Sequence, residues 1–268
     1  MDELSDLLFR CSELRNGLMQ KDPAPGSRAA LDFSELASLE GYPEATEQLI
    51  RCFDVWTVVT SDQLRGFATI IDSRQSAYAI YPIMRSVIEH SAWICWILYE
   101  TKTPIQRVAR ANLALLDTAK RRIETASLIY GTDSDQKATA QEDYVGIKND
   151  IKKTFNNVTL EPMSIEGETF PAPMDIVAHL GKILGDERLW SGVYKQLCGM
   201  ANHPSLNVLE ILKVGASGKH EFNVSRERMV QNVRQTIGPY LRSLLYMCAY
   251  MGWETEKLDR MYDEVVDE

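Results

Sequence analysis

The segment Ile80–Tyr99 carries three ionisable side chains in the middle of an otherwise apolar run. Arg85, Glu89 and His90 lie within six positions, and two tryptophans follow them. On a helix, Arg85 and Glu89 are four residues apart on the same side, so their charges can pair. His90 has an ordinary pKa of about 6.5 and suits proton transfer at neutral pH. These three residues are the first candidates for chemistry.

Aromatic side chains flank these charges, and two interpretations are open. Arg85 and Glu89 either form a structural ion pair that fixes the packing of the helix, or line a cavity between helices. An isolated buried charge is costly, which favours pairing. A mostly apolar pocket with a few converging polar groups is instead typical of a ligand site. The aromatic walls of such a pocket would be Tyr78, Tyr81, Trp93 and Trp96.

A second polar cluster contains Tyr194, Asn202 and His203, near the end of an expected helix. A histidine at a helix C-terminus can simply bond the free carbonyl groups there. Alternatively, His203 reaches Arg85 or Glu89 from a neighbouring helix. Glu89 and His203 would then serve as base and acid of a small-molecule enzyme.

Several familiar motifs are absent from the sequence. It contains no G-x-x-x-x-G-K-[ST] phosphate loop, no G-x-G-x-x-G turn, no H-E-x-x-H motif and no cysteine or histidine cluster with zinc spacing. We therefore expect no metal site and no cofactor. The five cysteines are far apart in apolar helical contexts, so we expect reduced core residues.

The elements that must position these side chains are helical over nearly the whole chain. No face of Ile80–Tyr99 is polar, and a helix that is apolar all round is surrounded by other helices. Thr103, Pro104 and Gln106 predict a capping box that begins a helix ending at Tyr130. The stretch from about Pro43 to Tyr99 is expected to be helical, with a division or kink at Gly66 and Pro82. Other helices are expected near 4–18, 34–40, 134–155, 174–184, 186–202, 206–214, 225–251 and at the carboxyl end.

Strand is expected in one place only, where Val158–Leu160 and Glu168–Phe170 could pair as a small hairpin. The fold class is therefore all-α, a multi-helix bundle of about nine or ten helices around a central apolar helix, with at most one small hairpin. We expect a single domain over residues 1–268. It comprises an N-terminal helical arm (1–42), a bundle core (43–252) with a loop at 156–173, and an acidic C-terminal helix (253–268).

Composition and charge narrow the expected partners. The net charge of −9 opposes binding of nucleic acid through the overall field. A membrane span needs about 20 predominantly apolar residues, whereas the longest charge-free piece of the central helix, Ser91–Tyr99, is shorter. The amino terminus M-D-E-L-S-D is acidic where a secretion signal would be basic. We therefore expect a cytoplasmic protein with no membrane partner.

The expected helix 103–130 also carries a row of arginines on one side. Such a stripe could contact phosphates, and the alternative is a solvated face of an amphipathic helix. The residues concerned are Arg107, Arg110, Arg121 and Arg122.

Two resemblances add to this reading. The pattern Tyr-x-x-x-Arg-Ser-x-x-Glu, here Tyr81, Arg85, Ser86 and Glu89 followed by Trp96, resembles uncharacterised all-helical bacterial proteins, which often have a later Tyr and His element, here Tyr194 and His203. This resemblance implies a bacterial accessory or defence setting and brings no established activity.

The segment R-S-V-I-E-H also resembles the Arg-x4–6-His signature of the HEPN ribonucleases, which are small helical bundles. That resemblance implies metal-free cleavage of RNA at a site that commonly assembles across a homodimer. His90 would handle the 2′-hydroxyl proton, and Arg85 would hold the phosphate.

The leading hypothesis is a helical-bundle binding or regulatory module with a polar and aromatic pocket around Arg85 and Glu89. Its partner would be a small molecule or a protein. The HEPN-like ribonuclease, with RNA as partner, and the small-molecule enzyme are the alternatives.

Overall fold

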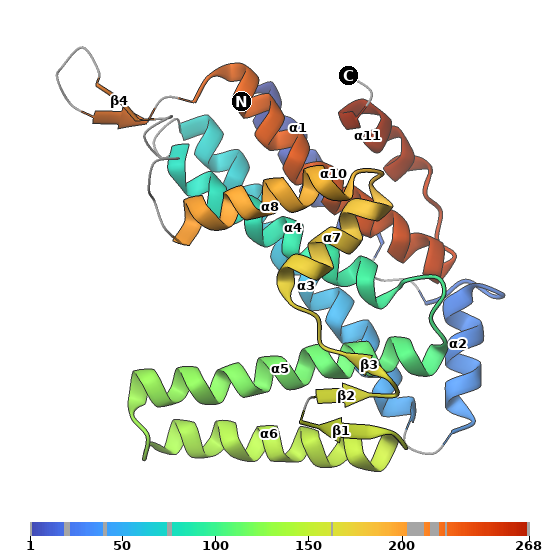
Figure 1. The fold of residues 1–268 in the computed structure, drawn as a ribbon. Coiled ribbons are helices and arrows are strands. Elements are labelled where there is room, and N and C mark those ends of the chain that lie inside the picture. Colours follow the sequence, from blue (N-terminus) through green and yellow to red (C-terminus); the bar gives the residue numbers. More distant parts are fainter. Residues whose placement is uncertain are drawn as a thin grey trace. The chain divides into compact units, whose positions relative to one another are not determined.

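The computed structural model describes residues 2–18, 22–39, 42–73, 77–161, 163–202, 212–214, 220–222 and 224–266. Within them the chain is helical almost throughout, which confirms the all-α multi-helix fold class (Figure 1). The described α-helices are α1 (Glu3–Glu13), α2 (Arg28–Ala37), α3 (Tyr42–Ser73), α4 (Ile80–Ile97), α5 (Pro104–Tyr130), α6 (Asp135–Thr154), α7 (Pro173–Ile183), α8 (Glu187–Asn202), α10 (Arg226–Met251) and α11 (Glu256–Val266). Short 3-10 turns cover Leu14–Gly17 and Ala77–Ala79.

The strands are more numerous than the single hairpin that we expected. β1 (Val158–Leu160) pairs with β2 (Met163–Ile165), and β2 pairs with β3 (Glu168–Thr169), all antiparallel. The two predicted segments are thus both strands, but an unpredicted strand lies between them. A second pair joins β4 (Leu212–Val214) to β5 (His220–Phe222), so residues 212–214 are strand where the sequence suggested helix.

The chain packs into two compact units. Unit 1 comprises Met1–Arg28, Asp54–Trp96 and Ala172–Glu268, and unit 2 comprises Ala29–Phe53 and Ile97–Pro171. The single domain expected from the sequence stays a prediction.

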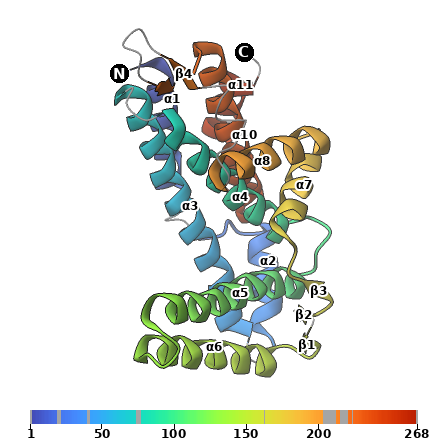
Figure 2. The same ribbon diagram turned by 60° about the vertical axis from the view of Figure 1, so that its left-hand side comes forward.

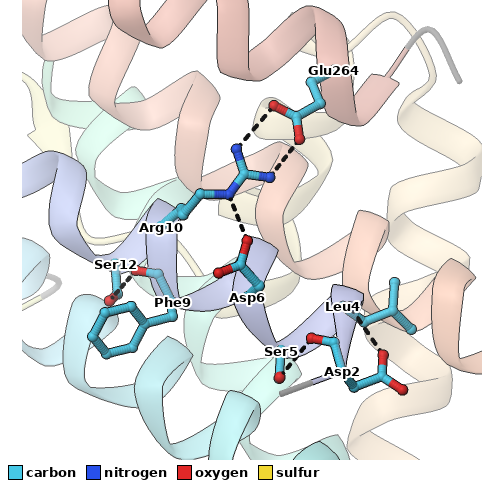
Figure 3. Close-up of polar contacts among 8 residues, drawn as sticks. All are labelled: Asp2, Leu4, Ser5, Asp6, Phe9, Arg10, Ser12 and Glu264. Atoms are coloured by element: carbon cyan, nitrogen blue, oxygen red, sulfur yellow. Dashed lines mark hydrogen bonds and ion pairs between the residues drawn. The ribbon is translucent and has the colours of Figure 1, made fainter.

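In unit 1, polar side chains at the surface of α1 form bonds within that helix and to α11. Arg10 bonds Asp6 on its own helix at 3.0 Å and both carboxylate oxygens of Glu264 on α11 at 2.5 and 3.2 Å (Figure 3). These bonds raise the pKa of Arg10, with Glu264 as the largest cause. Asp2 caps the helix by accepting from the Leu4 amide, and the Ser5 hydroxyl donates to the Asp2 carbonyl (Figure 3).

The helix α4 is buried along most of its length, as its apolar surface predicts. From α3, Trp56 stacks on Trp93 with ring centroids 5.9 Å apart, and the Gln63 amide donates to the Ser86 hydroxyl at 2.7 Å. Burial raises the pKa of the Cys95 thiol on α4 to about 12. All five cysteines are free thiols.

The end of α10 requires a glycine. Gly252 adopts φ +70°, and a Cβ there would lie 2.7 Å from the Cβ of Ser27. The chain therefore leaves α10 in the left-handed conformation and passes close to the segment before α2.

In unit 2, α5 and α6 lie side by side in both views and run antiparallel (Figures 1 and 2). The capping box predicted at the start of α5 is present, since the Thr103 hydroxyl accepts from the Gln106 amide while the Gln106 side chain accepts from the Thr103 amide. The helix ends at Tyr130, as predicted.

The arginines of α5 do not form a bare basic stripe. Arg107 bonds Asp32 at 2.7 Å, and both side chains are only 2% exposed. Arg110 bonds Glu168 at 2.7 Å, and Lys102 reaches the other oxygen of the same carboxylate at 2.8 Å. These contacts hold β3 against α5. Burial lowers the pKa of Arg110, and Glu168 opposes that shift.

The two outer arginines of the row lie at the surface. Arg121 bonds Asp117 on its own helix, and Arg122 bonds Asp143 on α6. The four arginines thus differ in burial although they share a helix, and each of them has a carboxylate partner.

Replacing one member of the buried pair tests this arrangement. We expect Arg107→Met to lower the free energy of unfolding by about 3–5 kcal/mol, because Asp32 keeps a buried charge without its partner. The same change at Arg122 removes an exposed pair and should cost less than about 1 kcal/mol. Urea unfolding followed by circular dichroism measures both. Equal losses in the two variants would contradict the distinction.

Candidate site in a cavity between α4, α8 and α10

A cavity of about 380 Å³ lies in unit 1 between three helices that are far apart in sequence. Each helix contributes residues at helical spacing, so that one stripe of each helix faces the same space. The lining residues are Tyr81 and Met84 of α4, Val193, Gln196, Leu197 and Met200 of α8, and Ser225, Glu227, Arg228, Gln231, Asn232 and Gln235 at the start of α10.

The lining separates into a buried floor and an open rim. The floor consists of Tyr81, Met84, Leu197, Met200 and Asn232, which are all buried. The rim is polar and includes exposed side chains from α8 and α10. Apolar side chains therefore gather at the floor, whereas most of the lining as a whole is polar, which differs from the mostly apolar lining of a typical small-molecule site.

Two floor residues carry buried polar atoms that have no hydrogen-bond partner. These atoms are the Tyr81 hydroxyl oxygen and the Asn232 side-chain nitrogen, in residues that are 2% and 6% exposed. Such atoms are rare in folded proteins, and each costs about 1–3 kcal/mol when left unpaired. Both residues line the cavity, although the two atoms themselves are buried. Because the terminal torsion of an asparagine is soft, the amide can rotate toward a bound molecule.

The amino end of α10 forms one side of the rim. Ser225 caps the helix, with its hydroxyl accepting from the Arg228 amide at 3.2 Å. The pKa of Glu227 is lowered, first by its own backbone N–H group and then by the Ser225 hydroxyl. The free amides that would attract an anion to this helix end are thus already close to a resident carboxylate.

Tyr194 of α8 joins the two charges that the sequence singled out on α4. Its hydroxyl donates to Glu89 Oε2 at 2.8 Å, while the Arg85 guanidinium carbon lies 5.9 Å from its ring centroid. Arg85 Nε and Glu89 Oε2 are 3.9 Å apart, which is an ion-pair distance but too long for a hydrogen bond. The side chains of Arg85 and Glu89 are 29% and 26% exposed, so this cluster is half-buried.

The pKa shifts in this cluster follow from its contacts. Burial first, and then the hydrogen bond to Glu89, raise the pKa of Tyr194, so its hydroxyl remains protonated and donates. For Arg85, burial acts to lower the pKa, but the hydrogen bond with Tyr194 and the nearby acidic groups outweigh it, and the pKa is raised. At neutral pH, Tyr194 is therefore uncharged and Arg85 carries its positive charge.

The other predicted aromatic residues lie in several places. Tyr81 is the only one of the predicted site residues among the described lining of the cavity. The Tyr78 hydroxyl donates to the backbone carbonyl of Met200, a floor residue. Trp93 packs between Trp56 and Trp96, with the ring centroid of Trp96 5.4 Å away, and both α4 tryptophans are buried.

The structure describes the side chain of His90, but not those of His203 and Asn202 in the predicted second cluster. The His90 pKa is lowered by burial, against the opposing charge of Glu89, and its Nδ1 atom is buried without a hydrogen-bond partner. His203 lies outside the described residues, and for Asn202 only the backbone at the end of α8 is described. The pairing of Glu89 with His203 and the ribonuclease assignment of Arg85 and His90 stay predictions.

Sequence reasoning missed the contribution of α10 to the floor. Asn232 stands immediately before the buried Val233 and one turn before the buried Thr236, whereas Gln231 is exposed. The position of this carboxamide next to Val233, where the buried side of the helix begins, is the signal that could have identified it.

Comparisons with models of protein families, with curated proteins and with solved structures find no match. Among the residues that the structure describes, no group of three or more histidine, cysteine, aspartate or glutamate side chains is placed to hold a metal ion. None of the helices in the described ranges combines the length and apolar character that crossing a membrane requires.

Two tyrosine substitutions test the polar contacts around this site. We expect Tyr194→Phe to lower the free energy of unfolding by about 1–2 kcal/mol, because Glu89 loses its donor. Tyr81→Phe is the matched control, since the same atom is removed from an equally buried tyrosine. It should leave the ligand-free protein as stable as before or slightly more stable, because that hydroxyl has no partner. Urea unfolding measures the stability of both variants. An equal loss in the two would contradict the conclusion that only the Tyr194 hydroxyl has a hydrogen-bond partner.

Proposed function

We propose that this chain is a helical-bundle binding module that holds a small polar molecule in the cavity between α4, α8 and α10. The observation that carries the proposal is the pair of unpartnered polar atoms, from Tyr81 and Asn232, behind the floor of that cavity. A bound molecule would supply the missing hydrogen-bond partners. The free protein bears the cost of these atoms, and the complex recovers it.

The size and form of the cavity support a small molecule over a protein segment. Its volume of about 380 Å³ falls in the range of about 300–1,000 Å³ that is typical of ligand pockets. Residues from three helices line it and it opens at a rim, whereas a protein partner usually needs a broad and flatter surface.

The cluster of Arg85, Glu89 and Tyr194 has a supporting role in this proposal. Tyr81 and Arg85 are one helical turn apart on α4, and Tyr194 and Leu197 are one turn apart on α8, so the cluster and the cavity share two helices. The bond from Tyr194 to Glu89 fixes the spacing of α4 and α8 next to the floor. A cavity held open in this way needs little ordering when a ligand enters.

Asn232 provides the direct test. We expect Asn232→Leu to raise the melting temperature, because an unpartnered amide is replaced by an apolar group of similar volume. The same change should abolish binding of uncharged carbonyl compounds such as benzamide, nicotinamide and 2-pyridone. Nuclear magnetic resonance of the ¹⁵N-labelled chain detects that binding through shifts of the Asn232 side-chain amide and of the floor residues.

Ser243→Ala is the matched control for this experiment. Ser243 is also a buried polar residue of α10, but its hydroxyl bonds the Tyr240 carbonyl and it does not line the cavity. This variant should bind the fragments as the natural chain does. If none of the fragments shifts the floor resonances, or if Asn232→Leu binds them unchanged, the cavity is not the binding site.

A further inference from the structure

The polar lining of the cavity consists mainly of carboxamides, and this composition points to a class of ligand. Four of the twelve described lining residues are asparagine or glutamine, namely Gln196, Gln231, Asn232 and Gln235. A carboxamide presents a donor and an acceptor side by side. That pair matches the edge of a nucleobase, and asparagine and glutamine read adenine through paired bonds of this kind.

The floor suits a flat ring. Met84, Leu197 and Met200 supply apolar contacts, and methionine sulfur packs favourably against aromatic rings. Tyr81 and Asn232 add polar groups beside this apolar surface. Pockets that accept a single base combine these two features, with apolar side chains on the ring faces and hydrogen bonds at the ring edge.

The charges at the rim oppose a phosphate group. Glu227 and Arg228 are its only charged residues among those described, and their charges cancel. Arg228 already interacts with another residue. The free N–H groups at the amino end of α10 would otherwise favour an anion. The Glu227 carboxylate, however, already interacts with a backbone N–H group there, and its negative charge repels a second anion.

We infer that the ligand of this cavity is an uncharged nucleobase compound, either a free base or a nucleoside. The inference rests on the proposed function and names the ligand class for the same site. The base edge lies against Asn232 and Tyr81, and the ring faces contact the floor methionines. The ribose of a nucleoside is directed to the rim, where Gln196 and Gln231 can bond its hydroxyl groups.

Isothermal titration calorimetry with adenosine, guanosine, cytidine, uridine and their 5′-monophosphates tests this inference. We expect at least one nucleoside to bind, and to bind about tenfold or more weakly to Asn232→Leu, which loses the bond to the base edge. Ser243→Ala is the control and should bind like the natural chain. The corresponding monophosphate should bind more weakly than the nucleoside, because its charge faces Glu227.

Glu227→Gln separates the effect of charge from the effect of size. Because Glu227 is exposed, this change should leave the fold intact. We expect it to narrow the difference in affinity between nucleoside and monophosphate. An unchanged difference, or a monophosphate that binds the natural chain as tightly as its nucleoside, overturns the assignment of an uncharged ligand.

The outcomes also separate this inference from the proposed function. If no nucleoside binds while benzamide or 2-pyridone still shifts the floor resonances, the ligand class is wrong and the binding site stands. If neither group of compounds binds, both are wrong. Binding of a nucleoside that Asn232→Leu does not weaken places the nucleoside elsewhere and also overturns the inference.

Discussion

The helix α4 has apolar side chains on every side, and this surface leaves water only when other helices cover it all round. In unit 1, α3 covers it through the stacked Trp56 and the Gln63 amide, and α8 covers it through Tyr194. The start of α10 faces it across the cavity. Because most of the helix is covered, its polar groups are partly or wholly removed from water, and those that are buried need a hydrogen-bond partner. The candidate site follows from how that requirement is met along α4.

Two buried tyrosines differ in whether their hydroxyl group has a hydrogen-bond partner. Tyr194 and Tyr81 are each 2% exposed, yet the Tyr194 hydroxyl bonds Glu89 while the Tyr81 hydroxyl has no partner. The two lie at the same packed interface of α4 and α8. A general failure of packing would affect both of them. Tyr81 lines the cavity, as does Asn232 of α10, whose amide nitrogen also has no partner; His90 Nδ1, away from the cavity on α4, is unpartnered as well.

Local signals in the sequence predicted much of the fold, and long-range contacts explain what they missed. The capping residues Thr103 and Gln106 placed the start of α5, because a cap depends only on neighbours in the chain. Arg107 and Arg110 of the same helix read as a basic stripe, because their carboxylates lie 75 and 58 residues away in sequence. The same limit applies to the site. The sequence identified Tyr81 as a site residue, but the floor of the cavity also includes Asn232 of α10. The periodicity of apolar residues within α4 does not show which other helix packs opposite it.

The cavity persists because two bonds along α8 hold that helix in place. Tyr194 bonds Glu89, and six residues further along the helix the Met200 carbonyl accepts from Tyr78. Leu197, a floor residue, lies between these two points. Collapse of α8 onto α4 would bury more apolar surface but would break both bonds and leave a carboxylate without its donor. The polar contacts therefore oppose closure of the cavity, and the Tyr81 hydroxyl and the Asn232 amide nitrogen at its floor stay without a hydrogen-bond partner.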